Sequence, residues 1–536
     1  MQIPLAEDEE FSLCFVSFVW RQLEFAFFGA ATSVVALFVC TGENKKEEKK
    51  MKKVLALLAL ILAFTLVLAS CHTDPPIGGD NNDNGENTED GGNTEHTHSF
   101  GEWVIAKAPT CTEQGEEERS CACGEKEIKA TNELGHNMVN SSCSACGKTY
   151  SQGLKFTSKG DGTCFIREIG DCTDTDIIIP PTSPDGDSVT SIGESAFEYC
   201  DSLSSVMIPD SVTSIGDYAF YSCDNLSSVV IPDSVISIGM RAFKDCTSLT
   251  SVVIPDSVTD ISGAFQNCSN LSSVVIPDSV TYIGGAFMYC TSLKSVVIPD
   301  SVTSIDSAFY DCDSLSSVVI PDSVTSIVNE EFYGCDSLSS VVIPDSVTSI
   351  GDLAFSDCDS LKNIVIPDSV TSIGDEAFRN CDSLSSVVIP DSVTSIGAEV
   401  FYWCKSLTSV VIGNNVTSIG DYSFFGCDLL KSIIIGTRVT SIGDSAFYGC
   451  ASLSSVVIPD SVTSIGDLAF SDCDSLKNIV IPDSVTSIGD SAFMDCDSLA
   501  DVYYTGSEEK WVAISIDMSN DCLTNATIHY NYVPEE

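Results

Sequence analysis

"LSSVVIPDSVISIGMRAFKDC", residues 226–246, contains the repeated pattern that decides the fold. Written as L-x-x-V-x-I-P-x-x-V-x-x-I-G-x-x-A-F-x-x-C, the pattern returns every 22 or 23 residues. A fixed period of this length is typical of solenoids and repeat arrays. One unit cannot bury its own apolar side, whereas stacked units can, so the repeat predicts a solenoid. The leucines that mark the units are Leu203, Leu226, Leu249, Leu271, Leu293, Leu315, Leu338, Leu361, Leu384, Leu407, Leu430, Leu453, Leu476 and Leu499.

Each unit has the residues expected of a short strand followed by a turn. Leu226, Val229 and Ile231 have the spacing of inward-facing strand residues, because side chains alternate along a strand. Pro232 ends this strand because proline has no N–H to donate to a ladder. The apolar residues return inward at 235–238, before a glycine turns the chain and an Ala-Phe pair closes the coil.

Over residues 154–500 the pattern closely resembles the BspA-like leucine-rich repeats of bacterial surface proteins. The resemblance implies a β-rich solenoid: a right-handed leucine-rich-repeat coil with parallel strands and about 14 coils of 22–23 residues. Residues 176–197 resemble the opening coil of that family, with Cys172 as an extra rung.

The last segment, 501–536, is expected to cap the solenoid, because its part from 501 to 530 resembles the closing segment of the same family. Tyr503 and Trp511 would cover the apolar face of the last coil, as the end of a solenoid requires.

Alternation along the strand also points one aliphatic side chain outward in every coil, and we call this line the valine row. Its members are Met207, Val230, Val253, Val275, Val297, Val319, Val342, Val365, Val388, Val411, Ile434, Val457 and Val480. The row has two interpretations: strand propensity, because valine suits a pleated surface, and a binding face, because contiguous exposed apolar surface usually marks contact.

One cluster of residues departs from the repeat. The Pro-Asp dipeptide is replaced in two consecutive coils, and basic and aromatic residues gather near them in the sequence. The cluster is either a contact site or sequence drift in two coils, and its members are Tyr402, Trp403, Lys405, Lys431 and Arg438.

The cysteine of the pattern falls at an inward position after the Ala-Phe pair. It is expected to be a small buried hydrophobe, because buried thiols are poor nucleophiles. Disulfides between neighbouring rungs are the alternative, although parallel thiols rarely reach the required dihedral angle. The column comprises Cys200, Cys223, Cys246, Cys268, Cys290, Cys312, Cys335, Cys358, Cys381, Cys404, Cys427, Cys450, Cys473 and Cys496.

An aspartate follows the proline in most coils, and we call this line the aspartate row. Like charges at coil spacing repel one another; solvent screening or, as the lesser alternative, bound calcium would relieve the repulsion. The Gly-rich signature of calcium-binding β-rolls is absent from the sequence. The row comprises Asp210, Asp233, Asp256, Asp278, Asp300, Asp322, Asp345, Asp368, Asp391, Asp460 and Asp483.

The beginning of the chain predicts an exported, lipid-anchored protein. Residues 51–70 read as a signal peptide that ends in a lipobox-like segment, so Cys71 is the expected lipidation site and a plain transmembrane anchor is the alternative. Residues 71–97 read as a disordered tether. Residues 1–50 are expected to be a mis-called extension upstream of the true start at Met51; a first membrane segment is the other interpretation.

Residues 98–150 form a cysteine- and histidine-rich module that resembles small zinc-ribbon-like units. Two knuckle-like Cys-Gly turns about twenty residues apart suit a structural zinc ion. Disulfides are the alternative that an extracytoplasmic location favours. The candidate ligands are Cys111, Cys121, Cys123, His136, Cys143 and Cys146.

The net charge of −52 argues against nucleic-acid binding and against direct adhesion to anionic lipid. No histidine lies between His136 and His529, which removes the commonest general base from the repeats, so no enzyme and no organic cofactor are expected. We expect a cell-surface protein that binds or adheres to host or neighbouring-cell proteins or glycans. A surface spacer without a specific ligand is the second hypothesis.

Overall fold

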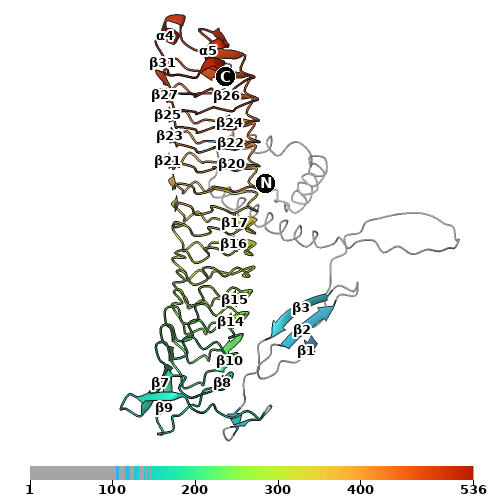
Figure 1. Ribbon diagram of the computed structural model, residues 1–536, viewed down its shortest axis with the longest axis vertical. Helices are drawn as coiled ribbons and strands as arrows, with labels where there is room; N and C mark the ends of the chain where they lie inside the picture. Colours follow the sequence, from blue (N-terminus) through green and yellow to red (C-terminus); the bar gives the residue numbers. More distant parts are fainter. Residues whose placement is uncertain are drawn as a thin grey trace, which may run out of the picture. The chain divides into compact units, whose positions relative to one another are not determined.

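The predicted solenoid is confirmed. The computed structural model describes residues 104–107, 115–120, 126–131, 138–139, 142–144 and 147–534. From residue 151 onward the coils stack in sequence order, each lying on the one before it (Figure 1). Their apolar side chains form one continuous core that extends from Leu154 to Leu523.

The first strand of each coil pairs in parallel and in register with the strand of the next coil; for example, Val206 lies opposite Val229. These strands form the first strand row, along the right-hand edge of the solenoid in Figure 1. They are β8 (Asp176–Ile178), β10 (Ser205–Met207), β12 (Ser228–Val230), β14 (Ser251–Val253), β15 (Ser273–Val275), β16 (Ser317–Val319), β17 (Ser340–Val342), β20 (Ser386–Val388), β22 (Ser409–Val411), β24 (Ser432–Ile434), β26 (Ser455–Val457), β28 (Asn478–Ile481) and β30 (Asp501–Tyr504).

Shorter strands around the Ser-Ile dipeptide form a second strand row, along the opposite edge. Where coils have 22 residues, this row contains only isolated bridges, such as those joining Tyr282 to Asp260 and Ser304. Its strands are β9 (Ser188–Ile192), β11 (Ser214–Ile215), β13 (Ser237–Ile238), β18 (Ser349–Ile350), β19 (Ser372–Ile373), β21 (Ser395–Ile396), β23 (Ser418–Ile419), β25 (Ser441–Ile442), β27 (Ser464–Ile465), β29 (Ser487–Ile488) and β31 (Ser515–Ile516).

The turns between the rows explain the fixed proline and glycine. The N–H of Val235 donates to the carbonyl of Pro232 at 3.0 Å, which closes a tight turn after the first strand. At Gly239 the neighbouring coil lies so close that a Cβ would stand 2.4 Å from the backbone nitrogen of Asp217. Only glycine allows this approach.

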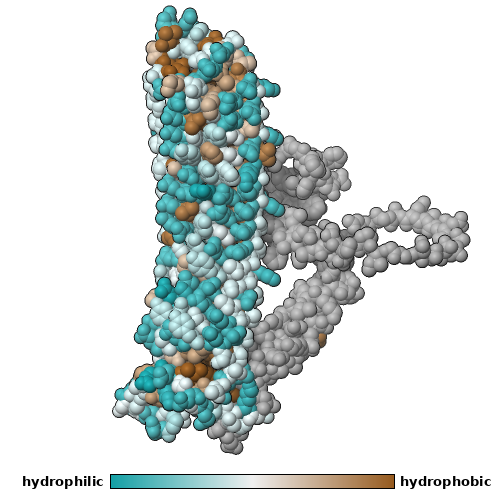
Figure 2. Space-filling model, in the orientation of Figure 1, coloured by the Kyte–Doolittle hydropathy of each residue, from teal (hydrophilic) through white to brown (hydrophobic). Residues whose placement is uncertain are grey.

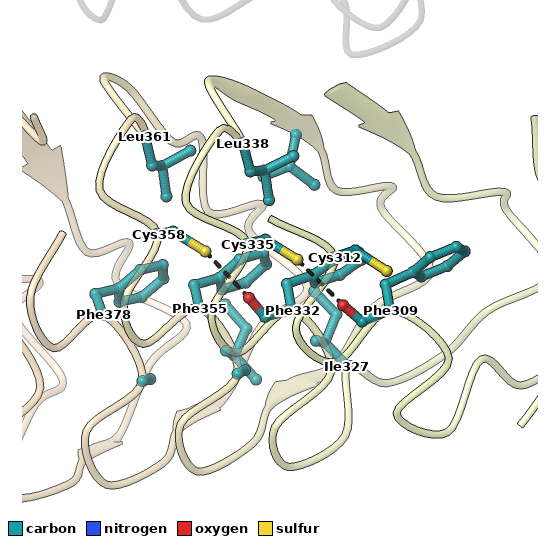
Figure 3. Packing of buried hydrophobic residues seen from close by; sticks show 14 of the residues in the cluster. Phe309, Cys312, Ile327, Phe332, Cys335, Leu338, Phe355, Cys358, Leu361 and Phe378 are labelled. Carbon is teal, nitrogen blue, oxygen red and sulfur yellow. Dashed lines mark hydrogen bonds between the residues drawn. The ribbon is translucent and has the colours of Figure 1, made fainter. Parts of the chain in front are cut away.

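The third side of each coil is a chain of tight turns around the Ala-Phe pair. The N–H of Phe243 donates to the carbonyl of Ala264 in the next coil at 2.8 Å. Arg241 and Asp245 adopt left-handed φ angles of 57° and 61°, which direct alternate N–H groups toward the neighbouring coil. The phenylalanine rings stack along the core from Phe197 to Phe493, with neighbouring centroids 5.0–6.1 Å apart (Figure 3).

Both ends of the core are covered. The hairpin β6 (Lys155–Ser158) and β7 (Thr163–Glu168) pairs with β9 at the first coil. At the other end, β30 carries Tyr503 and the fully buried Tyr504, whose ring meets that of Trp511 at 5.1 Å. The closing segment also contains α4 (Glu508–Val512), α5 (Asp521–Asn525) and β32 (Thr527–His529). Trp511, which lies on α4, packs against the core, as predicted.

A separate small sheet precedes the solenoid. Strands β1 (Val104–Lys107), β2 (Gly115–Ser120) and β3 (Lys126–Thr131) pair antiparallel, as do β4 (Met138–Val139) and β5 (Ser142–Cys143). The predicted extension, signal peptide, lipidation site Cys71 and tether all lie outside the described residues. Among the predicted zinc ligands, only Cys143 lies within them, and it is buried in β5.

Candidate binding surface

The valine row forms an exposed aliphatic line along the first strand row. Eight of its side chains are between 48% exposed, at Val253, and 82% exposed, at Val297. The others in this group are Val275, Val319, Val365, Val388, Ile434 and Val457. A continuous apolar line of this kind is unusual on a soluble protein and generally marks contact.

Five members of the valine row are less accessible. Met207, Val230, Val342 and Val411 are half-buried. Val480 is only 7% exposed, so its assignment to a binding face is wrong. Val480 lies opposite Tyr503 of the closing segment, and the large ring beside it covers the position that open neighbouring coils leave accessible. The usable part of the row therefore ends before β28.

The aspartate row borders the valine row, three residues further along each coil, and all its members are exposed. At its C-terminal end the carboxylates have partners: Asp391 accepts the N–H of Asn414 at 2.7 Å, and Asp483 pairs with Lys510. In the middle of the solenoid no described side chain pairs with the carboxylates of Asp256, Asp278, Asp300, Asp322, Asp345 and Asp368. These charges face solvent beside an apolar line.

The opposite border of the valine row carries four of the six lysines between residues 176 and 500. Each directly follows the leucine of its coil and is exposed; they are Lys294, Lys362, Lys431 and Lys477. The valine row therefore separates a strongly acidic border from one that is neutral or locally basic.

Part of the predicted aromatic and basic cluster is brought together. Arg379 lies 4.8 Å over the Tyr402 ring, which stacks on Phe425 at 4.9 Å, and Phe425 stacks on Tyr448 at 4.7 Å. Trp403 lies beside Tyr402 at 6.0 Å. These rings form a half-exposed stack on the corner that follows the phenylalanine turns.

The cations of this stack are already neutralised. Arg379 pairs with Glu376 at 2.6 Å and Glu399 at 3.1 Å, and Lys405 pairs with Asp382 at 2.9 Å while lying 5.3 Å over Trp403. The corner is therefore not an open site for an anion.

Two predicted members of the cluster lie elsewhere, so the single five-residue patch is wrong. Lys431 stands at the start of β24 on the border of the valine row. Arg438 lies in the turn between β24 and β25, where it donates to the side-chain carbonyl of Asn415 at 2.9 Å. The two residues are close in sequence to the aromatic corner, but different sides of the coil carry them.

The cysteine column is buried from Cys223 to Cys496. From Cys223 onward each thiol donates to the carbonyl of a phenylalanine in the preceding coil, as Cys335 does to Phe309 at 3.1 Å (Figure 3). Burial raises the pKa of Cys290 to about 12, so its thiol stays neutral at physiological pH. The prediction of a buried hydrophobic ladder is confirmed within the solenoid, apart from half-buried Cys200.

A buried glutamate interrupts the repeat at one coil. Glu331 stands where other coils have the alanine before phenylalanine, and it is fully buried. Its two carboxylate oxygens accept the N–H groups of Ser307 at 2.7 Å and Ala308 at 3.0 Å. Burial raises its pKa to about 8, and Asp306 nearby adds to the shift.

Sequence reasoning missed a second line of aspartates, which follow the glycine in seven of the coils: Asp217, Asp352, Asp375, Asp421, Asp444, Asp467 and Asp490. Asp352 accepts the N–H of Asp375 at 2.9 Å, and Asp375 accepts that of Ala398 at 2.8 Å. The signal was present in the repeated Ile-Gly-Asp, but a periodic aspartate on a surface turn does not by itself distinguish a hydrogen-bond acceptor from a solvated charge.

Metal, membrane and pocket features are sparse in the described part of the chain. No group of three or more His, Cys, Asp or Glu side chains there is arranged to hold a metal ion. No helix among the described residues has the length and apolar character needed to cross a bilayer. Two open depressions of about 460 and 380 Å³ lie along the second strand row, lined mainly by serine and glycine and by the Ile-Gly-Asp turns.

Comparison with protein families gives one result for the repeats. The model of the BspA type leucine-rich repeat region, which spans six copies, matches residues 175–286, 284–407 and 394–512. No curated protein matches the chain.

Solved structures of bacterial leucine-rich repeat proteins are similar to this chain. A leucine-rich repeat protein from Bacteroides ovatus is 32% identical, with a TM-score of 0.63, over 70% of this chain and 98% of that one. A leucine rich cell surface protein from Faecalibacterium prausnitzii is 34% identical, with a TM-score of 0.43, over 69% of this chain and 98% of that one.

Proposed function

This chain belongs to the BspA-type leucine-rich repeat family, and on that premise we propose that it is a cell-surface binding protein whose valine row contacts other extracellular proteins. The observation that carries the proposal is the line of eight aliphatic side chains on the first strand row that are at least 48% exposed. The face of the solenoid shown in Figure 2 is mainly hydrophilic, with scattered hydrophobic residues.

The proposed location is outside the cytoplasm, with the chain anchored through a lipid on Cys71. The sequence supports this: residues 51–70 have the basic start and apolar run of a signal peptide, and a polar segment follows the cysteine. The solenoid would then be held away from the membrane and reach its partners by its length. The large negative charge keeps such a repetitive surface soluble.

A binding assay tests the valine row. The chain from His72 to Glu536, which lacks the lipidation site, is immobilised and offered extracellular matrix and surface proteins, with and without calcium. Replacing Val275, Val297 and Val365 by serine should weaken capture at least about ten-fold, because each substitution removes exposed apolar contact area. The far-UV circular dichroism should not change, because none of the three side chains belongs to the core.

The matched control changes exposed valines outside the row. Val512→Ser and Val533→Ser alter side chains of the closing segment that are 76% and 80% exposed. This double variant should capture partners as the native chain does. Equal capture by the triple variant and the native chain would contradict the proposal and favour a spacer without a specific ligand.

Structural zinc in the module at 98–150 remains a prediction, with disulfides as the alternative. Metal analysis of the purified chain after dialysis distinguishes the two: one bound zinc ion per chain, lost with a chelator, supports the zinc site. Resistance of the cysteines to alkylation until a reductant is added supports disulfides. Catalysis is not part of the proposal, because the repeats hold no histidine and their thiols are buried.

A further inference from the structure

The charge pattern around the valine row narrows the class of protein segment that the row can bind. This inference rests on the proposed function. From Val253 to Val388, an apolar line that is exposed except at half-buried Val342 runs beside six carboxylates for which the described residues provide no counter-charge. We infer that this stretch binds a basic amphipathic α-helix of another protein, with its apolar face on the valine row and its lysines and arginines on the aspartate row.

The repeat distance favours a helix over an extended segment. Neighbouring rungs of a parallel sheet lie about 4.8 Å apart. One turn of an α-helix rises about 5.4 Å, so each turn of a helix lying along the solenoid axis meets about one rung. A strand presents side chains of one face every ~6.7 Å and falls out of step by the second rung.

The length of the surface sets the length of the partner. Val253 and Val388 are separated by six rungs, or about 29 Å, which a helix spans with roughly 19 residues. The mismatch of about 0.6 Å per turn accumulates to ~3 Å over this length, which flexible lysine side chains can absorb.

The width of the surface also suits one helix. Three residues separate Val297 from Asp300 along the coil, which limits the distance between their Cα atoms to about 10 Å. A helix with its side chains is about 10–12 Å across, so it covers both rows at once.

The two borders make the site directional. Lys294 and Lys362 stand on the side away from the aspartate row and would repel a second line of basic residues. The partner helix is therefore basic on one flank only. A second copy of this chain is disfavoured as the occupant, because its acidic surface would be repelled.

The test uses a designed probe and the chain from His72 to Glu536. A 21-residue peptide with leucines at alternating three- and four-residue spacing, lysines on one flank and glutamines at the remaining positions is titrated by fluorescence anisotropy at ~20 and ~300 mM salt. The structure predicts saturable binding. A peptide of the same composition whose leucines occupy every second position of its central part, and the helical peptide with glutamate for lysine, should bind at least about ten-fold more weakly.

Two variants separate the apolar and the charged contribution. Asp278→Asn, Asp300→Asn and Asp322→Asn together should weaken peptide binding about ten-fold at low salt and much less at high salt. Val275→Ser, Val297→Ser and Val319→Ser together should weaken binding about equally at both salt concentrations, because apolar contact is not screened.

A matched control removes the same amount of charge at positions outside the aspartate row. Asp313→Asn, Asp336→Asn and Asp359→Asn remove the same charge from exposed positions after the cysteines, and should change binding less than about two-fold. Equal loss in this control, or equal binding of the period-two peptide, overturns the inference. If the helical peptide does not bind while capture of surface proteins still depends on the valine row, the inference fails and the proposed function stands.

Discussion

At the scale of single residues, Glu331 has a structural role that the repeat pattern does not indicate. In coils of equal length, turn N–H groups donate to carbonyls of the next coil, as Ser195 does to Asp217 at 3.0 Å. The 22-residue coil that contains Ser307 lies against a 23-residue coil, so the turns no longer match. The side chain of Glu331 supplies the acceptors that the shifted backbone does not, because buried N–H groups need partners.

The raised pKa of Glu331 predicts that the free energy of unfolding depends on pH. Its pKa is about 8 in the folded protein and 4.5 ordinarily, so between these values the folded state keeps a proton that the unfolded state has lost. The free energy of unfolding should therefore fall as pH rises from 4.5 to 8, by at most about 4 kcal/mol from this group. Glu331→Ala should reduce the difference in thermal midpoint between pH 5 and pH 8.

The control for this prediction is Val400→Ala, which changes the equivalent position of another coil without removing an ionisable group. It should lower stability equally at both pH values. If Glu331→Ala retains the full pH dependence of the native chain, Glu331 is not its source and the prediction is wrong.

At the scale of elements, the closing segment replaces the coil that is missing after the last repeat. The side-chain carbonyl of buried Asn520 accepts the N–H of Phe493 at 3.0 Å, and its amide donates to the carbonyl of Gly489 at 2.9 Å. The first of these bonds replaces the one that a further coil would accept, as the carbonyl of Ala492 accepts the N–H of Phe470 at 2.8 Å. This lets α5 end the stack without leaving buried polar groups unpaired.

Asn520→Ala should destabilise the closing segment. Removing buried hydrogen-bond partners costs about 2–3 kcal/mol, so the free energy of unfolding measured with urea should drop by that amount. Asn525→Ala, which changes an exposed residue of the same helix, should have little effect. Equal stability of the two variants would show that the cap does not depend on Asn520.

The elements that could be predicted from the sequence are those that are determined by residues of a single coil. The end of the strand, the core and the turn are indicated by the chemistry of Pro232, Ile238 and Phe243, and the structure confirms all three. Glu331 and the aspartates after the glycines depend instead on the position of the neighbouring coil. Val480 was mistaken for the same reason, because Tyr503 from the next strand covers it.

At the scale of the whole molecule, each coil contacts mainly its two neighbours, so the solenoid behaves as a one-dimensional stack. Residues 341–375 and 456–490 are identical, with an offset of 115 residues, which indicates duplication of a block of five coils. A protein that gains coils in this way extends its valine and aspartate rows without disturbing any existing contact. A longer row gives a repetitive partner more rungs to bind.

The most direct test of this account removes the block. Deleting residues 353–467 joins Asp352 to Leu468 and recreates a native sequence at the junction. Small-angle X-ray scattering of the shortened and native chains should show a folded particle whose longest dimension is smaller by about 25 Å, the height of five rungs. A chain that loses its compact scattering, or keeps the native length, would contradict the account, because the coils would then not be independent layers of one stack.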